Sequence, residues 1–119
     1  MAVHKIPRPK SVEGTTTRVR LTCGNLYITV NRLNGKLFEV FATLGRSGGC
    51  TSSGMTTLTT CITMGLRHGI PPEVYIDKIV GSHCPVLSWD DGIKYLSCPD
   101  AIGQILAQEL EKLKDANKA

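Results

Sequence analysis

Residues 26–44 read LYITVNRLNGKLFEVFATL, and this stretch decides the fold. Apolar side chains alternate with polar ones on both sides of Asn34-Gly35, which is the period of half-buried β-strands. An Asn-Gly pair between two such runs is typical of a hairpin turn. The stretch therefore predicts two antiparallel strands, at about 25–32 and 36–44.

The register of this hairpin follows from its apolar positions. A plain two-residue loop at Asn34-Gly35 would place Val30 opposite Glu39 and leave both faces of the sheet mixed. A three-residue loop that begins at Leu33, with Gly35 in the left-handed region, restores one apolar face. The pairs that we expect are Val30 with Phe38, Ile28 with Val40 and Leu26 with Ala42.

The opposite face of the predicted sheet is basic and aromatic. It carries Arg18, Arg20, Tyr27, Thr29, Asn31, Glu39 and Phe41. Ordinary solvent exposure, a protein interface and the stacking of a nucleic-acid base all fit such a surface. Nucleic acid is the least favoured of these interpretations, because the basic excess is confined to the leader and the flanking strand.

Outside the hairpin, the pattern predicts another strand at about 15–23 and helices at about 52–68, 71–80 and 99–114. The segment from Gly81 to Leu96 has no clear period, so we expect it to wrap the surface with Trp89 and Tyr95 as anchors. The fold class is therefore α+β, a three-stranded antiparallel sheet followed by three helices packed on one face.

The helix at 52–68 has two distinct faces. Its apolar stripe consists of Leu58, Cys61, Ile62, Gly65 and Leu66, so Cys61 is expected in the core. Its polar face carries Thr56, Thr57, Thr59, Thr60 and Thr63 in place of the usual charged residues. Uncharged hydroxyls tolerate contact with another subunit and equally well with the sheet of the same chain, so both interpretations stay open.

Length and composition limit the class of protein. The 119 residues suit one domain, at 15–119, behind an extended leader at 1–14. The leader accounts for much of the formal charge of +4 and is expected either to be solvated or to approach phosphates. No apolar run could span a membrane, and residues 1–9 lack the apolar centre of a signal peptide, so we expect a cytoplasmic protein.

Four of the five cysteines lie where the chain turns, at Cys23, Cys50, Cys84 and Cys98. Cys50 and Cys98 each begin a predicted helix, where the dipole lowers the pKa of a thiol. Four converging thiolates suit a tetrahedral zinc ion, with His83 as an alternative to a thiol. The spacing has no Cys-x-x-Cys knuckle, so buried thiols that pack as small hydrophobes, or a pair that oxidises, remain alternatives.

A second candidate site is the glycine-rich stretch at 44–53, which ends a strand and begins a helix. Its backbone amides and side chains could cradle a phosphate, although a tight structural turn is the favoured interpretation. The candidate ligand-binding residues are Arg46, Ser47, Gly48, Gly49, Thr51 and Ser52. No group of nucleophile, base and orienting acid marks the chain as an enzyme.

Several separated motifs occur in an order that resembles the TSCPD domain. This family takes its name from a short motif that appears here as Leu96-Ser97-Cys98-Pro99-Asp100-Ala101-Ile102, with Leu96 in place of the usual threonine. The other matching stretches are Cys23 to Asn31, Phe38 to Gly45, Gly48-Gly49-Cys50 and Cys84-Pro85. The resemblance covers about residues 7–110.

The resemblance implies a domain found near the C-terminus of vitamin B12-dependent (class II) ribonucleotide reductases and as free-standing small proteins. It also implies that Cys23, Cys50, Cys84 and Cys98 form the cysteine set, with zinc as the expected cofactor, and that Cys61 stands outside it. The chain has no room for the catalytic barrel of a reductase.

The leading hypothesis is a non-catalytic module, stabilised by zinc, that binds a nucleotide or a class II ribonucleotide reductase. The alternative is a free-standing homo-oligomer that binds and sequesters a small phosphorylated nucleotide signal. A third hypothesis, an enzyme with Cys50 or Cys98 as nucleophile, is the least supported by the residues.

Overall fold

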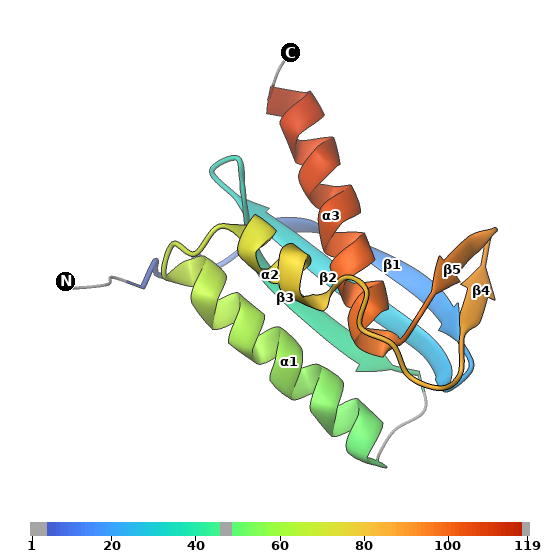
Figure 1. The fold of residues 1–119 in the computed structure, drawn as a ribbon. Coiled ribbons are helices and arrows are strands. Elements are labelled where there is room, and N and C mark those ends of the chain that lie inside the picture. Colours follow the sequence, from blue (N-terminus) through green and yellow to red (C-terminus); the bar gives the residue numbers. More distant parts are fainter. Residues whose placement is uncertain (1–4, 46–48, 118–119) are drawn as a thin grey trace.

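The computed structural model describes residues 5–45 and 49–117, with Gly49 and Cys50 described in their backbone only (Figure 1). The sheet consists of β1 (Glu13–Leu21), β2 (Gly24–Leu33) and β3 (Lys36–Leu44). It is followed by α1 (Gly49–Arg67), α2 (Pro72–Ile79), the short strands β4 (Ser88–Asp90) and β5 (Ile93–Tyr95), and α3 (Cys98–Asn117). The predicted α+β class and its order of elements are confirmed.

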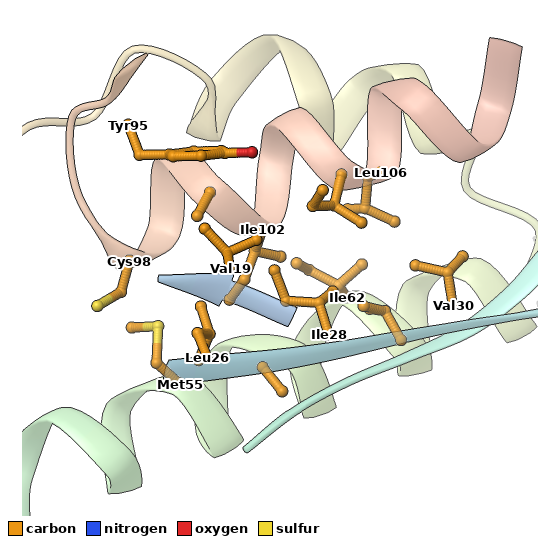
Figure 2. Packing of buried hydrophobic residues seen from close by; sticks show 14 of the residues in the cluster. Val19, Leu26, Ile28, Val30, Met55, Ile62, Tyr95, Cys98, Ile102 and Leu106 are labelled. Atoms are coloured by element: carbon orange, nitrogen blue, oxygen red, sulfur yellow. The ribbon is translucent and has the colours of Figure 1, made fainter. Parts of the chain in front are cut away.

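The three helices cover one face of the sheet, as predicted. The strands lie in the order β1-β2-β3, and all neighbours are antiparallel. Helix α1 runs along β3, α3 lies over the rest of the sheet, and α2 packs beside α3 (Figure 1). Between these layers, Ile62 of α1 and Ile102 and Leu106 of α3 meet Ile28 and Val30 of the sheet (Figure 2). No helix within the described ranges combines the length and apolar composition needed to cross a membrane.

The register predicted for the β2–β3 hairpin is wrong. The loop has two residues, Asn34 and Gly35, both in the left-handed region with φ of 54° and 75°, and Leu33 pairs with Lys36. A β-bulge repairs the register further along, because Asn31 pairs with Glu39 whereas Arg32 pairs with Leu37. The strands then pair as Val30 with Val40, Ile28 with Ala42 and Leu26 with Leu44.

The bulge has a packing cause. It lets both Leu37 and Phe38 be buried, although neighbouring residues of a regular strand point to opposite faces. Phe38 lies beneath the guanidinium of Arg67, with the arginine carbon 5.3 Å from the ring centroid. The apolar face that the sequence analysis expected is therefore obtained by an extra residue in β3 and not by a longer loop.

Helix α1 is rotated relative to the predicted stripe. Cys61, which was expected in the core, is exposed, whereas Met55, Ile62 and Leu66 are buried together with Thr59 and Thr63. Two of the five threonines thus face the sheet of the same chain, as one of the two open interpretations required. Thr56, Thr57 and Thr60 are exposed.

Thr63 forms hydrogen bonds with backbone groups at the open edge of β3. Its hydroxyl donates to the Val40 carbonyl at 2.8 Å and accepts from the Val40 amide at 3.0 Å. Because β3 is the last strand of the sheet, these two backbone groups have no strand partner on that side. The hydroxyl of one buried threonine therefore supplies the two hydrogen-bond partners that a further strand would have given to Val40.

The segment from Gly81 to Leu96 contains more order than predicted. Strands β4 and β5 form a hairpin around Asp91 and Gly92, both with positive φ. Tyr95 is buried as expected, but Trp89 is 64% exposed and anchors nothing. Asp90 and Ser88 hold β4 to β1 by accepting from the amides of Arg20 and Thr22.

The leader is irregular from residue 5 to residue 12 and is tied to the domain at two points. The Ile6 amide donates to the Arg67 carbonyl at the end of α1. The guanidinium of Arg8 pairs with the carboxylate of Glu39, and Glu39 is 1% exposed. At least one of the leader's cations therefore neutralises a buried acid.

We predict that Thr63→Val lowers the free energy of unfolding by about 2 to 4 kcal/mol, because it leaves a buried amide and a buried carbonyl unpaired. Thr60→Val is the matched control, since the Thr60 hydroxyl is exposed and bonds only to its own helix at Thr56. Urea denaturation of the two variants measures the difference. Equal stabilities would show that Thr63 does not close the edge of β3.

Candidate cysteine site

Three of the four predicted ligands meet at one end of the domain. Cys23 lies in the turn between β1 and β2, Cys84 in the loop before β4, and Cys98 begins α3. All three line one cavity of about 230 Å³. The remaining lining residues are Leu21, Thr22, Val86, Ser88 and Ser97. The structure thus brings together three of the four cysteines that the sequence analysis singled out.

The three thiols are a close pair and a more distant third. The Sγ atoms of Cys23 and Cys98 are 3.0 Å apart and share a hydrogen bond. The thiol of Cys84 donates instead to the carbonyls of Val86, at 3.1 Å, and Leu96, at 3.5 Å. Among the described side chains, no three Cys, His, Asp or Glu residues are grouped closely enough to hold a metal ion.

The pKa of Cys98 departs from the sequence-based expectation. Burial raises it to about 12, with further contributions from the hydrogen bond to Cys23 and the charges of Cys23 and Cys84. The expected lowering by the helix dipole is therefore wrong for Cys98 without a metal, because desolvation and the neighbouring thiols outweigh the dipole. A bound cation would reverse this balance, because it stabilises thiolates directly.

The fourth cysteine begins α1 on the same end of the sheet. Leu44 at the end of β3 pairs with Leu26, three residues after Cys23. The Gly45 amide donates to the Asn25 carbonyl, and α1 starts at Gly49. Cys50 thus follows, a few residues along the chain, a backbone that is bonded to the β1–β2 end of the sheet. Its side chain lies outside the described part of the chain. A ligand role for Cys50 stays a prediction.

The Ser97-Cys98-Pro99-Asp100 motif holds this end together by hydrogen bonds. The Ser97 hydroxyl accepts from the Asp100 amide, as a helix cap does, and donates to the Ser82 carbonyl at 2.6 Å. The Asp100 carboxylate accepts from the amides of Gly81 and Leu96, at 2.8 and 2.9 Å, and from the Gln104 side chain at 2.7 Å. It therefore ties both ends of the 81–96 loop to the first turn of α3.

The sequence analysis missed this role, because it named Asp100 only as part of the family motif. A usable signal was present, since Ser followed three residues later by an acid is the capping-box spacing. A second signal was Gly103. A Cβ there would lie 2.8 Å from Val80 Cγ2, so glycine lets the end of α2 approach α3 and brings Gly81 to Asp100.

The other candidate residues do not line the cysteine cavity, or lie outside the described ranges. Arg46, Ser47 and Gly48 of the predicted phosphate site are not described, and Gly49 begins α1. Thr51 is exposed and Ser52 half-buried in the first turn of that helix. His83 is exposed beside Cys84.

A larger cavity, of about 540 Å³, lies at the opposite end of the domain, and no sequence motif pointed to it. It opens between the β2–β3 turn, the α1–α2 connection and the second half of α3. Leu37, Phe38 and Leu66 form part of its apolar wall, and Lys36 and Lys114 lie on it as well. None of the four cysteines whose side chains are described contributes to it.

Fold and site together define an α+β module whose cysteines and Ser-Cys-Pro-Asp helix start close one end of a three-stranded sheet. A model of the TSCPD domain family matches residues 2–110, so the chain belongs to the TSCPD domain family. No curated protein and no solved structure matches the chain.

We predict that Cys98 is the slowest of the described cysteines to react with iodoacetamide at pH 8 in metal-free protein. The thiolate is the reactive form, and a pKa of about 12 leaves almost none of it at that pH, while raising the pH toward 12 increases it. Mass spectrometry of the alkylated protein measures each rate, with the exposed Cys61 as reference. Reaction of Cys98 as fast as Cys61 would contradict the assigned environment.

Proposed function

We propose that this protein is a non-catalytic binding module, stabilised by zinc, that acts as an accessory to a class II ribonucleotide reductase. The observation that carries the proposal is the meeting of Cys23, Cys84 and Cys98 in one cavity at the family's own motif. The metal fixes the frame, and the partner binds a surface beside it.

The donor set supports zinc. Two thiols already lie 3.0 Å apart, and a third lines the same cavity. Cys84 would supply the third ligand from the wall of this cavity, and Cys50 would supply the fourth. Thiolates in a set of four are the usual ligands of structural zinc, which contributes directly to folding. Such an ion would join the β1–β2 turn, the loop before β4 and two helix starts.

A structural role for the motif is also supported by what its polar atoms already do. The Ser97 hydroxyl and both oxygens of Asp100 are engaged in hydrogen bonds that hold the backbone. The raised pKa of Cys98 disfavours it as a nucleophile. These features favour a binding module over an enzyme.

An apolar patch beside the cysteines supports a protein partner. It consists of Val86, Leu87 and Trp89, each more than two-fifths exposed. Grouped exposed apolar side chains mark interaction surfaces, and tryptophan is frequent at their energetic centres. Val86 also lines the cysteine cavity, so a metal there would fix the patch. The family's occurrence in class II reductases makes such an enzyme the proposed partner.

Nucleotide binding and the alternative of a sequestering homo-oligomer rest on the glycine-rich stretch before α1 and on the exposed threonines of that helix. Native mass spectrometry of protein purified from cells reports subunit number and retained nucleotide together. A monomer without nucleotide would argue against the sequestering alternative while leaving the accessory role intact.

We predict that protein purified without chelator contains one zinc ion and that Cys98→Ser and Cys23→Ser lose it. The loss follows because a neutral hydroxyl replaces a thiolate ligand. Cys61→Ser is the matched control and keeps its zinc, since Cys61 lies on the exposed side of α1. Native mass spectrometry and elemental analysis measure the metal. Wild-type protein without metal, or a metal lost equally from all three variants, would refute the zinc site.

We predict that Trp89→Ala weakens binding to a purified class II ribonucleotide reductase about 10-fold to 30-fold, as expected for a truncated central aromatic. Val74→Ala is the control, because Val74 is 48% exposed on α2, outside the patch. Surface-immobilised reductase and titrated module give both affinities. If the wild-type protein does not bind the reductase, the accessory role fails, whether or not zinc is present.

A further inference from the structure

The three helices lie on one face of the sheet and leave the opposite face uncovered (Figure 1). That opposite face carries two aromatic side chains. Tyr27 of β2 is 39% exposed and Phe41 of β3 is 46% exposed. Phe41 pairs with Thr29, which follows Tyr27 by two positions, so the two rings are diagonal neighbours on one face. Diagonal neighbours in a sheet are about 7–8 Å apart, within reach of each other for aromatic side chains.

Two arginines extend the same surface across β1. Arg18 pairs directly with Tyr27, and Arg20 pairs with Asn25, one position further along the same face. Both arginine side chains belong to exposed residues. Asp90 lies at the outer edge of β1, where its carboxylate accepts from the Arg20 amide. The surface defined by Arg18, Arg20, Tyr27 and Phe41 is called the outer face below.

The acid on this side of the described strands is neutralised. Glu39 precedes Phe41 by two residues in β3 and lies on the same, outer face of the sheet. It is buried beneath Arg8, whose guanidinium nitrogens lie 3.0 to 3.1 Å from its oxygens, and it also accepts from Asn31 at 2.8 Å. The leader thus neutralises Glu39, the carboxylate at an outer position of β1, β2 or β3, whereas the Asp90 carboxylate of β4 lies at the edge of the sheet beside Arg20.

The shape of the outer face favours an extended ligand. The described cavities are formed by other residues, at the two ends of the domain and beside the leader, and none includes Tyr27 or Phe41. A flat aromatic surface with flanking cations suits a polymer whose bases stack on the rings while its phosphates meet the arginines.

We propose that the outer face binds single-stranded nucleic acid, with Tyr27 and Phe41 stacking two neighbouring bases and Arg18 and Arg20 contacting phosphates. This reverses the preference drawn from the sequence, which could not place Arg8 on Glu39. The site uses no residue of the cysteine cavity or of the Trp89 patch, so it stands independently of the accessory role.

Fluorescence anisotropy with a labelled oligothymidylate or oligouridylate of about 12 nucleotides tests the proposal at low salt. Tyr27→Ala and Phe41→Ala each weaken binding about 5-fold to 100-fold, the range for loss of one stacked base. Tyr27→Phe retains binding, because the ring remains. Val74→Ala removes an exposed apolar side chain of α2, on the helix side of the sheet, and leaves binding unchanged. Circular dichroism confirms that each variant is folded.

Salt dependence gives a second, independent measure. Each phosphate contact contributes about 0.7 to the slope of log affinity against log salt for a single strand. Replacing both Arg18 and Arg20 by alanine therefore reduces that slope by about 1.4, whereas the aromatic variants leave it unchanged.

Three results would each overturn the proposal. One is no binding of either oligonucleotide at low salt. Another is binding that survives the combined loss of Tyr27 and Phe41. The third is sedimentation that shows a dimer dissolved by those two substitutions, because the outer face would then be an interface between copies of the chain. None of these results bears on the zinc content or on the reductase affinity, so the two proposals fail separately.

Discussion

The Asp100 carboxylate is the constraint on which the cysteine end of the domain depends. It is 1% exposed, and it accepts hydrogen bonds from Gly81, just beyond α2, and from Leu96, just before α3. A buried carboxylate is stable only when such donors surround it, so the charge and the loop geometry require each other. Together with the hydrogen bonds from Cys84 to the Leu96 carbonyl and from Ser97 to the Ser82 carbonyl, these bonds fix the position of Cys84 relative to Cys98.

The thiols add a second constraint at the same place. Metal-free Cys98 resists ionisation because burial and two neighbouring thiols all oppose a negative charge. That environment is costly for thiolates and favourable for a cation that pairs with them. A zinc ion would thus act on the first turn of α3 through the side chain of Cys98. Asp100 acts on the same turn through the backbone around it.

Much of the fold was predictable, because strand and helix periods are local. The hairpin at residues 26–44 and the start of α3 follow directly from alternation and capping. The errors came from tertiary packing. The bulge at Phe38 depends on the Arg67 side chain from α1 above it, and the rotation that exposes Cys61 depends on Thr63 bonding to Val40. Trp89 was expected to be an anchor because of its residue type. The sequence pattern gives no sign that its side chain is exposed.

The candidate site was predictable in its cysteines and not in its electrostatics. Turn positions indicated that Cys23, Cys84 and Cys98 converge, but the burial that raises the pKa of Cys98 exists only after α3 has packed. The structural role of Asp100 likewise needs Gly103, since the close approach of α2 brings Gly81 within reach of the carboxylate. The outer face was named from the sequence, whereas its charge depends on a contact between residues 8 and 39.

The unfolding free energy of Asp100→Asn, measured in urea with chelator present, tests the central claim most directly. The exposed Asp77→Asn on α2 is the control. The carboxylate accepts hydrogen bonds from three N–H groups, and the NH₂ group of an asparagine side chain would face at least one of them. The account therefore predicts a loss of about 2 to 4 kcal/mol for Asp100→Asn and little change for the control. Equal stability of the two variants would contradict it.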